Sequence, residues 1–509
     1  MPIGRPRIPG TEAERAEARR AKVRANVQAF RRRQKEKKLA QQASRPRTND
    51  GGPIQSRQTL VGGGQPTMLP PTIATFPNAC SQAYGSSVFP PEDPEYWLWA
   101  LPAEMGARLA GTTYQDAFVQ ALQYRFAPPA TTGERTTDGP CQRTAICCST
   151  WTTSAILEIG RPETEVLMEA LLAASLAIAG RDRRDPDMTL HSEYMQTRAL
   201  QKLRYSLTRY QDGDMTICPT MLSLTALTCA ISELIANKSW DNFNRHLLGV
   251  GALIFHGGVA GLNRQSAREH FYGYRAIQTP FLFMNRQRAF LSSPEWCDFP
   301  WKKHVEVAQH PLHSMLDIAL KILPEIVKQD MPKMWKVTCL KERLGKAWQV
   351  VEELDEWEHQ LRSRHRGILY IKTPSMWGGV YEHRLDFPGT STAIAFAMYT
   401  AVRVHVAALI ANISDEMSSR APTADVDPCS AMLEALRWSR LACQSLEYFH
   451  TGAPKVAGRI VTLWPLETAW ELFGRVHMEG SIDVSHEMAW CRSMAERHAS
   501  LGIPPFQWR

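Results

Sequence analysis

The sequence predicts an all-α body that follows a basic N-terminal arm. From about residue 93 onward, apolar residues recur at helical spacing, and glycine and proline fall mostly between the helical segments. Few segments show the strict alternation of a β-strand. Hydrophobic residues make up 44% of the 509 residues, enough to bury a sizeable core. We therefore expect an arm over residues 1–43, a disordered linker over residues 44–92 and a multi-helix domain over residues 93–509.

The arm contains one expected helix, over residues 11–43. This stretch has no glycine or proline and is rich in Ala, Arg, Lys, Glu and Gln, which are strong helix formers. Thr11 and Glu14 have the spacing of a capping box at its start. Its few apolar residues cannot pack a core. The segment over 44–92 is rich in Ser, Pro, Gly, Thr and Gln, which is typical of a flexible linker.

The body contains a series of expected helices, separated by turn residues. Their apolar residues repeat at intervals of three and four, which places them on one face of a helix. The stretch over 366–390 is less regular. The expected helices cover residues 163–180, 187–209, 220–236, 240–255, 263–279, 311–328, 333–364, 392–413, 427–448, 459–475 and 485–501.

The net charge of +8 is unevenly distributed. Residues 1–48 hold 15 Lys and Arg against 4 Glu, a balance of +11. The remaining residues hold 44 basic and 47 acidic side chains, a balance of −3. A cationic arm on a near-neutral body predicts a polyanionic partner, usually a nucleic acid.

Cysteine usage and hydropathy indicate the cellular compartment of the chain. The chain has 11 cysteines, none before Cys80, and no CxxC pair, which is typical of reduced, intracellular thiols that pack as small hydrophobes. Residues 1–40 lack an apolar stretch, so we expect no signal peptide. The longest apolar run, over 393–413, carries Arg403 and His405 at its middle. We therefore expect no membrane-spanning helix.

Two basic elements of the arm have DNA-binding patterns. Gly4-Arg5-Pro6-Arg7 resembles the core of an AT-hook, whose arginines enter the minor groove, although Ile3 replaces the usual preceding basic residue. On a helix, positions 23, 26, 27, 30 and 31 share one face, with basic residues on both sides. We expect Arg5 and Arg7 to lie in the minor groove. The expected phosphate contacts are Arg19, Arg20, Lys22, Arg24, Arg32, Arg33 and Lys35, and the expected major-groove contacts are Asn26, Phe30 and Arg31, with Gln28 as a helper.

The order of these elements resembles the basic region of fungal bZIP proteins. The chain keeps Gly4–Arg7, the Arg19-Arg20 pair and Ala29-Phe30-Arg31 at the family's spacing. The family's asparagine, alanine and glutamine reading positions hold other residues here: Val23, Asn26 and Val27. A leucine zipper is absent, because Leu39 is the sole heptad candidate and Pro46 ends the helix. If the chain binds DNA as a dimer, the body must supply the contact.

The arm has a simpler interpretation as well. A run of basic residues is often a solvated charge cluster or a nuclear-import signal. The import residues would be Arg31, Arg32, Arg33, Lys35, Lys37 and Lys38, and we expect the protein in the nucleus.

The body shows no pattern for catalysis. It has no glycine-rich phosphate loop, no G-x-S-x-G motif and no six-cysteine zinc cluster. His304, His310 and His313 lie close in sequence without a matching acid or thiol, so we expect loop or core histidines rather than a metal site. An acidic cluster is followed by Arg362, Arg364 and Arg366, which predicts a solvated, salt-bridged helix face. Its members are Glu352, Glu353, Asp355, Glu356 and Glu358.

A series of core elements recurs in order over roughly residues 120–505 of the body. These are Glu233, Trp240, His246-Leu247, Gly251-Ala252, Leu291, Glu295-Trp296, Pro300-Trp301, Ser445–Tyr448, Pro465-Leu466 and the segment 487–502. In this order they resemble the fungal-specific transcription factor domain that accompanies zinc-cluster proteins. The resemblance implies a regulatory and dimerising role. We expect His246 to hydrogen-bond at a helix junction and Gly251 to allow close helix packing.

The sequence thus predicts a DNA-binding transcriptional regulator of fungal type, with no cofactor and no enzymatic activity. DNA is the expected partner of the arm, and a second copy or another regulator is the expected partner of the body. One alternative is a nuclear cofactor or scaffold that has lost sequence-specific DNA recognition, which Val23 and the missing zipper favour. A second alternative is a helical enzyme with an apolar substrate, which a pocket with convergent titratable groups would favour.

Overall fold

The computed structural model describes residues 122, 150–159, 164–214, 216–236, 239–297, 310–329, 335–420, 427–450 and 457–500. By its internal contacts the chain divides into two units, Met1–Gly85 and Ser86–Arg509, and every described residue belongs to the second. In this part, 82% of residues are helical, which confirms the all-α prediction. The expected arm and linker over residues 1–92 lie outside the described residues.

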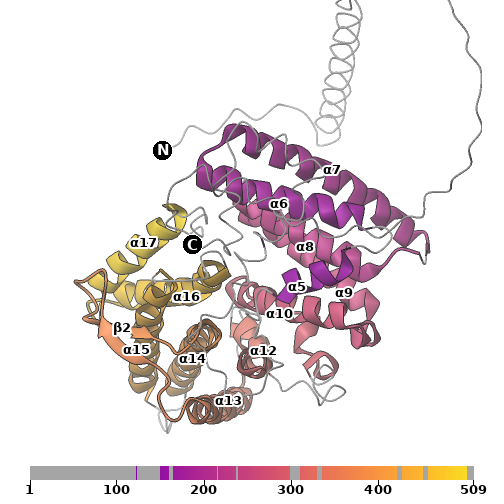
Figure 1. Ribbon diagram of the computed structural model, residues 1–509. Coiled ribbons are helices and arrows are strands. Elements are labelled where there is room, and N and C mark those ends of the chain that lie inside the picture. Colours follow the sequence, from indigo (N-terminus) through magenta and orange to yellow (C-terminus); the bar gives the residue numbers. More distant parts are fainter. Residues whose placement is uncertain are drawn as a thin grey trace, which may run out of the picture. The chain divides into compact units, whose positions relative to one another are not determined.

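The first half of the described body packs around helix α8 (Figure 1). Helix α6 lies against α7, and both contact α8, which also packs against α9. Helix α10 contacts α5, α8 and α9. The bounds are α5 Thr150–Glu158, α6 Glu165–Arg183, α7 Pro186–Gln211, α8 Pro219–Ala236, α9 Trp240–Gly257, η3 Val259–Asn263, α10 Gln265–Met284 and η4 Phe290–Ser292.

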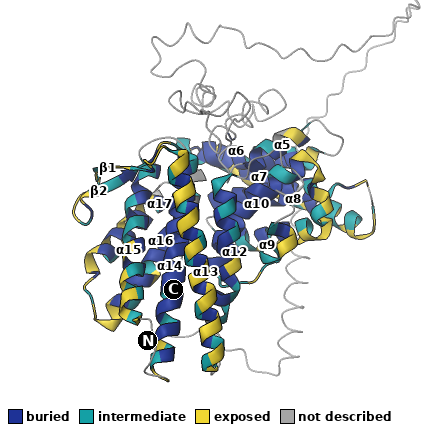
Figure 2. Cartoon of the chain, turned by 90° about the horizontal axis from the view of Figure 1, so that it is seen from below, coloured by how far each residue is buried: buried dark blue, intermediate teal, exposed yellow. Residues whose placement is uncertain are grey.

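The second half packs around helix α14, which contacts α12, α13, α15 and α16. Figure 2 shows α14 largely buried, whereas α13 presents a row of exposed residues. Helix α10 joins the halves, because it also contacts α12 and α16. The bounds are α12 Pro311–Gln329, α13 Val337–Arg364, β1 Ile371–Pro374, β2 His383–Asp386, α14 Thr390–Ser418, α15 Pro428–Leu446, η5 Glu447–His450, α16 Ala457–Glu479 and α17 Ser485–Ser500.

Local side-chain chemistry sets several helix starts. The carboxylate of Asp185 accepts hydrogen bonds from the first free N–H groups of α7, and Asp427 does the same for α15. Both helices have proline as their first residue, where its missing N–H costs nothing. The hydroxyl of Ser239 caps α9 by accepting from Asn242 N. These caps place the boundaries close to those expected from the sequence.

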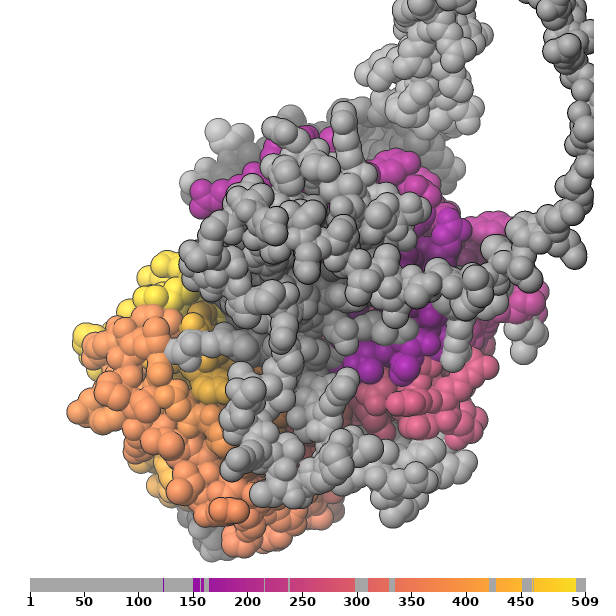
Figure 3. All heavy atoms as spheres, viewed as in Figure 1, coloured from indigo at the N-terminus to yellow at the C-terminus, as the bar shows by residue number. Residues whose placement is uncertain are grey.

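The irregular stretch over 366–390 contains an antiparallel hairpin. Strands β1 and β2 pair Ile371 with Asp386 and Pro374 with His383. Gly378 and Gly379 in the connection have φ of +51° and +91°, a backbone conformation that glycine adopts readily. The hairpin lies at the surface, in the orange region of Figure 3. Each strand has four residues, too few for an alternating pattern to be recognised.

Helices α8 and α14 are long and apolar enough to cross a membrane. In the fold, 83% and 89% of their most apolar windows are buried against other parts of the protein. The charged and polar residues in the middle of α14 are accommodated by partners. Arg403 pairs with Asp355, and His405 Nε2 accepts a hydrogen bond from Trp464 Nε1 at 3.3 Å.

Candidate functional site

The residues assigned to DNA contact and to nuclear import, from Arg5 to Lys38, lie outside the described residues. Their roles remain predictions. The described body therefore supplies the sites that can be built from side-chain geometry. Three of its features concern function: the histidines at the start of α12, the acidic cluster of α13 and a groove between α7 and α9.

Of the two described histidines, His313 is a core residue and His310 is half-buried at the start of α12, in agreement with the expected loop or core positions. His313 is buried in α12 and its ring lies 5.0 Å from that of Tyr272. His310 Nδ1 accepts a hydrogen bond from Leu312 N at 3.2 Å, which caps the start of α12. Burial, with a smaller effect from Arg364, lowers the pKa of His310 to about 4, so its ring is neutral at pH 7. His304 lies outside the described residues, among which no group of three or more His, Cys, Asp or Glu side chains is placed to hold a metal ion.

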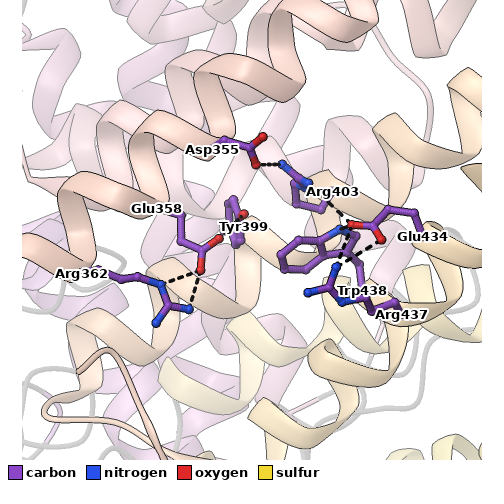
Figure 4. Close-up of polar contacts among 8 residues, drawn as sticks. All are labelled: Asp355, Glu358, Arg362, Tyr399, Arg403, Glu434, Arg437 and Trp438. Atoms are coloured by element: carbon purple, nitrogen blue, oxygen red, sulfur yellow. Dashed lines mark hydrogen bonds and ion pairs between the residues drawn. The ribbon is translucent and has the colours of Figure 1, made fainter. Parts of the chain in front are cut away.

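The acidic cluster of α13 forms ion pairs, of which Glu358–Arg362 is one that the sequence predicted, whereas among the described residues Arg364 and Arg366 form none (Figure 4). Glu358 accepts hydrogen bonds from Arg362 Nη2 at 2.6 Å and from the hydroxyl of Tyr399 at 2.8 Å. Asp355 pairs with Arg403 of α14. The cluster thus extends beyond its own helix, because both α14 partners come from a segment far along the chain.

Arg403 holds the three helices α13, α14 and α15 together. Its side chain is 9% exposed, and its guanidinium carbon lies 4.6 Å from the centre of the Trp438 ring, a cation–π contact. Glu434 of α15 lies 3.8 Å from Arg403 Nη2 and accepts a hydrogen bond from Trp438 Nε1 at 2.7 Å. Burial raises the pKa of Tyr399, so its phenol stays protonated. Each group has a partner, and the arrangement stabilises the packing of the helices (Figure 4).

A groove of about 700 Å³ lies between α7 and α9. Both helices pack on α8, and Ala226 of α8 contributes to its lining. Leu203 is buried, whereas Leu200, Leu207 and Leu253 are half-buried along the walls. The remaining lining residues are Arg204, Tyr210, Gln211, Arg245, His246, Gly249, Ala252 and His256.

Small residues of α9 keep this groove open. A Cβ atom at Gly249 would meet nothing within 4 Å. Gly251, two residues further on, faces α10 instead, where a Cβ would collide with the hydroxyl of Tyr274. This confirms the expectation that Gly251 allows close packing. The two glycines therefore serve opposite faces of one helix.

The lining is cationic at its polar positions. Among the described residues, it includes two arginines and two histidines but no aspartate or glutamate. Burial lowers the pKa of His246, against a smaller opposite effect of Glu233, so His246 is neutral at pH 7. The positive charge of the groove thus comes from Arg204 and Arg245, both exposed at its rim.

Sequence reasoning recognised part of this site. The helical spacing of Leu200, Leu203 and Leu207 was visible, and it predicts an apolar face on α7. The groove itself was missed, and His246, expected at a helix junction, lines it. A usable signal was the small pair Gly249 and Ala252 on the same helical face as Arg245, because small residues leave space between helices.

No family model matches the chain, and neither a curated protein nor a solved structure matches it.

Proposed function

We propose that this protein is a DNA-binding transcriptional regulator of fungal type, in which the basic arm contacts DNA and the helical body regulates or dimerises. The observation that carries the proposal is the segregation of charge, +11 over residues 1–48 against −3 over the rest. A cationic segment of this kind binds a polyanion largely because its Lys and Arg side chains release the counterions condensed on the polyanion. The Gly4–Arg7 element and the helical arrangement of residues 19–38 support DNA rather than another polyanion.

The body supports a regulatory rather than a DNA-contacting role. Many of its described basic residues are paired with acids, as in the pairs Arg198–Glu169, Arg209–Asp214 and Arg440–Glu487. A surface in which cations and anions neutralise each other attracts DNA weakly. The alternative of a nuclear cofactor without sequence-specific recognition places the same arm on DNA, but without a preferred sequence.

The test measures DNA binding by the full chain over a range of salt concentrations. The triple variant Arg32→Gln, Arg33→Gln, Lys35→Gln removes three expected phosphate contacts. We expect the slope of log K against log salt to flatten by about 2.7. The matched control removes the same charge from exposed body positions, as Lys341→Gln, Arg366→Gln and Arg492→Gln, and should leave the slope unchanged.

An unchanged slope in the arm variant, or an equal change in the control, refutes DNA contact by the arm. Selection of bound duplexes from a random pool then separates the two functions. Enrichment of a shared motif indicates a sequence-reading regulator, whereas a pool that stays random indicates the cofactor alternative.

A further inference from the structure

The groove between α7 and α9 is formed by the packing of both helices on α8. Helices α7 and α9 both lie on α8, and the groove runs along their facing sides. On α7 the lining runs from Leu200 to Gln211, and on α9 from Arg245 to His256, a length of about 16 Å in each helix. Its volume of about 700 Å³ lies within the range of small-molecule sites.

The charges of α7 distinguish the groove from the rest of that helix. Arg198 and Lys202 pair with Glu169, and Arg209 pairs with Asp214. Arg204 lines the groove, and in the described part of the chain its side chain has no ion-pair or hydrogen-bond partner. Arg245, across the groove on α9, is in the same situation among the described residues. Two guanidinium groups without a carboxylate thus border an apolar surface.

We propose that this groove binds an amphipathic organic anion of small-molecule size. Its hydrocarbon part lies along Leu200, Leu207 and Leu253, and its acidic head group pairs with Arg204 and Arg245. Burial of the hydrocarbon supplies most of the affinity, because apolar surface of both the ligand and the groove is removed from water. The guanidinium groups supply selectivity, since their planar geometry matches a carboxylate. The proposal is independent of the arm and of DNA binding.

A medium-chain fatty acid combines these properties. Its extended chain fits within a groove about 16 Å long, and its carboxylate can pair with the two arginines. Decanoate is therefore the probe, and 1-decanol is the neutral comparison with the same hydrocarbon chain. Isothermal titration calorimetry on the full chain measures both affinities.

The decisive variant fills the groove without disturbing the fold. Gly249→Leu projects a side chain into open space, because nothing lies within 4 Å of a Cβ at this position. Gly345→Leu is the matched control, since Gly345 lies in α13, is exposed and also has nothing within 4 Å of its Cβ position. Helical circular dichroism confirms that both variants fold. Ala252→Leu, at an exposed position of the same lining, provides a second filling variant.

We expect Gly249→Leu and Ala252→Leu to weaken decanoate binding at least tenfold, and Gly345→Leu to leave it unchanged. The double variant Arg204→Gln, Arg245→Gln should weaken decanoate by about tenfold or more and leave decanol unaffected. Absence of decanoate binding to the wild-type chain, or equal binding by Gly249→Leu and Gly345→Leu, overturns the assignment of the groove. Equal loss of decanol and decanoate in the arginine variant overturns the assignment of the head group. DNA binding measured on the same variants tests the arm separately.

Discussion

A buried ion pair between α12 and α13 gives a quantitative test of how charge stabilises the body. The side chains of Glu325 and Arg343 are 5% and 7% exposed, and Arg343 Nε donates to Glu325 Oε2 at 3.0 Å. Arg343 Nη2 also donates to the main-chain oxygen of Glu325 at 2.8 Å. Lys328 and Lys346 contact Glu325 Oε1 at 2.7 and 3.3 Å. The Glu325 carboxylate therefore forms ion pairs with three cations.

The two single substitutions differ in what they leave behind. Glu325→Gln leaves the buried Arg343 guanidinium without its carboxylate and beside Lys328, which costs about 3–5 kcal/mol of unfolding free energy. Arg343→Met leaves a carboxylate that keeps two lysines, so we expect a smaller cost of about 2 kcal/mol. The double variant Glu325→Leu, Arg343→Met removes both buried charges. Its matched single variants are Arg343→Met and Glu325→Leu, and Glu325→Leu leaves the Arg343 guanidinium as unpaired as Glu325→Gln does. Apolar replacement of a whole buried pair is often neutral, so we expect it within about 1 kcal/mol of wild type.

Urea unfolding followed by tryptophan fluorescence and circular dichroism measures these differences. The diagnostic result is that the second substitution rescues the first, because a buried unpaired charge is worse than none. A double variant whose loss equals the combined losses of the single variants would falsify the reasoning. Single losses below about 1 kcal/mol would show that the pair is effectively solvated.

The same carboxylate predicts a pH dependence. Burial alone raises the pKa of Glu325, but Lys328 and Lys346 outweigh it and bring the pKa below the ordinary 4.5. A folded-state pKa below the unfolded one stabilises the protein above pH 4.5, and this stability is lost as the pH falls through the folded-state pKa. We expect the unfolding free energy of wild type to fall more steeply below pH 4.5 than that of Glu325→Gln. Parallel curves would contradict the ion-pair account.

Three further predictions concern other parts of the body. Arg403→Met should lower the free energy of unfolding in urea by about 1–2 kcal/mol, less than Glu325→Gln does. Its acid partners are 59% and 38% exposed, so water solvates them once the guanidinium is gone. A loss above about 3 kcal/mol would contradict this. Gly251→Ala should lower the melting temperature and cost about 1–3 kcal/mol by collision with the buried side chain of α10, whereas Gly249→Ala should raise it, and equal effects would refute the assigned faces. The exposed Cys429 should react with iodoacetamide in the native protein, while Cys491, whose pKa burial raises, should stay unmodified until unfolding, as read by mass spectrometry.

The helices of the body were predictable because burial of one face imposes a repeat on the sequence. The expected helices over 187–209 and 333–364 correspond to α7, Pro186–Gln211, and α13, Val337–Arg364. Their ends depend on local chemistry that the sequence displays, such as the capping carboxylate of Asp427 before α15. The hairpin β1–β2 was missed because its strands are short and mostly unburied on both faces. Without a buried face there is no alternation to recognise.

The small residues Gly249 and Ala252 indicate space beside α9, but the sequence does not show which helix borders that space, since this depends on which helices share a neighbour. The apolar spacing of α7 predicts a buried face, but Leu200 and Leu207 remain half-buried beside the groove. Gly249 and Gly251 are the same residue type and lie two positions apart, yet Gly249 faces open space and Gly251 faces Tyr274. Their roles follow from the rotation of α9 on α8, which tertiary packing decides. The acidic cluster of α13 was easier, because its arginine partner Arg362 lies one turn away.

Pairing of charges, rather than their number, indicates where a partner is expected. Outside residues 1–48 the chain is nearly neutral, with a balance of −3, so an average body cation has an acid available. Arg198 and Arg209 of α7 follow this rule, and each pairs with an acid outside the helix. Among the described residues, Arg204 and Arg245 are two of the cations that depart from it, and these two lie at the rim of an apolar groove. An anion that binds in this groove therefore does not have to displace a carboxylate of the described residues from these two arginines. A hydrocarbon chain attached to the anion is buried against the apolar lining between α7 and α9.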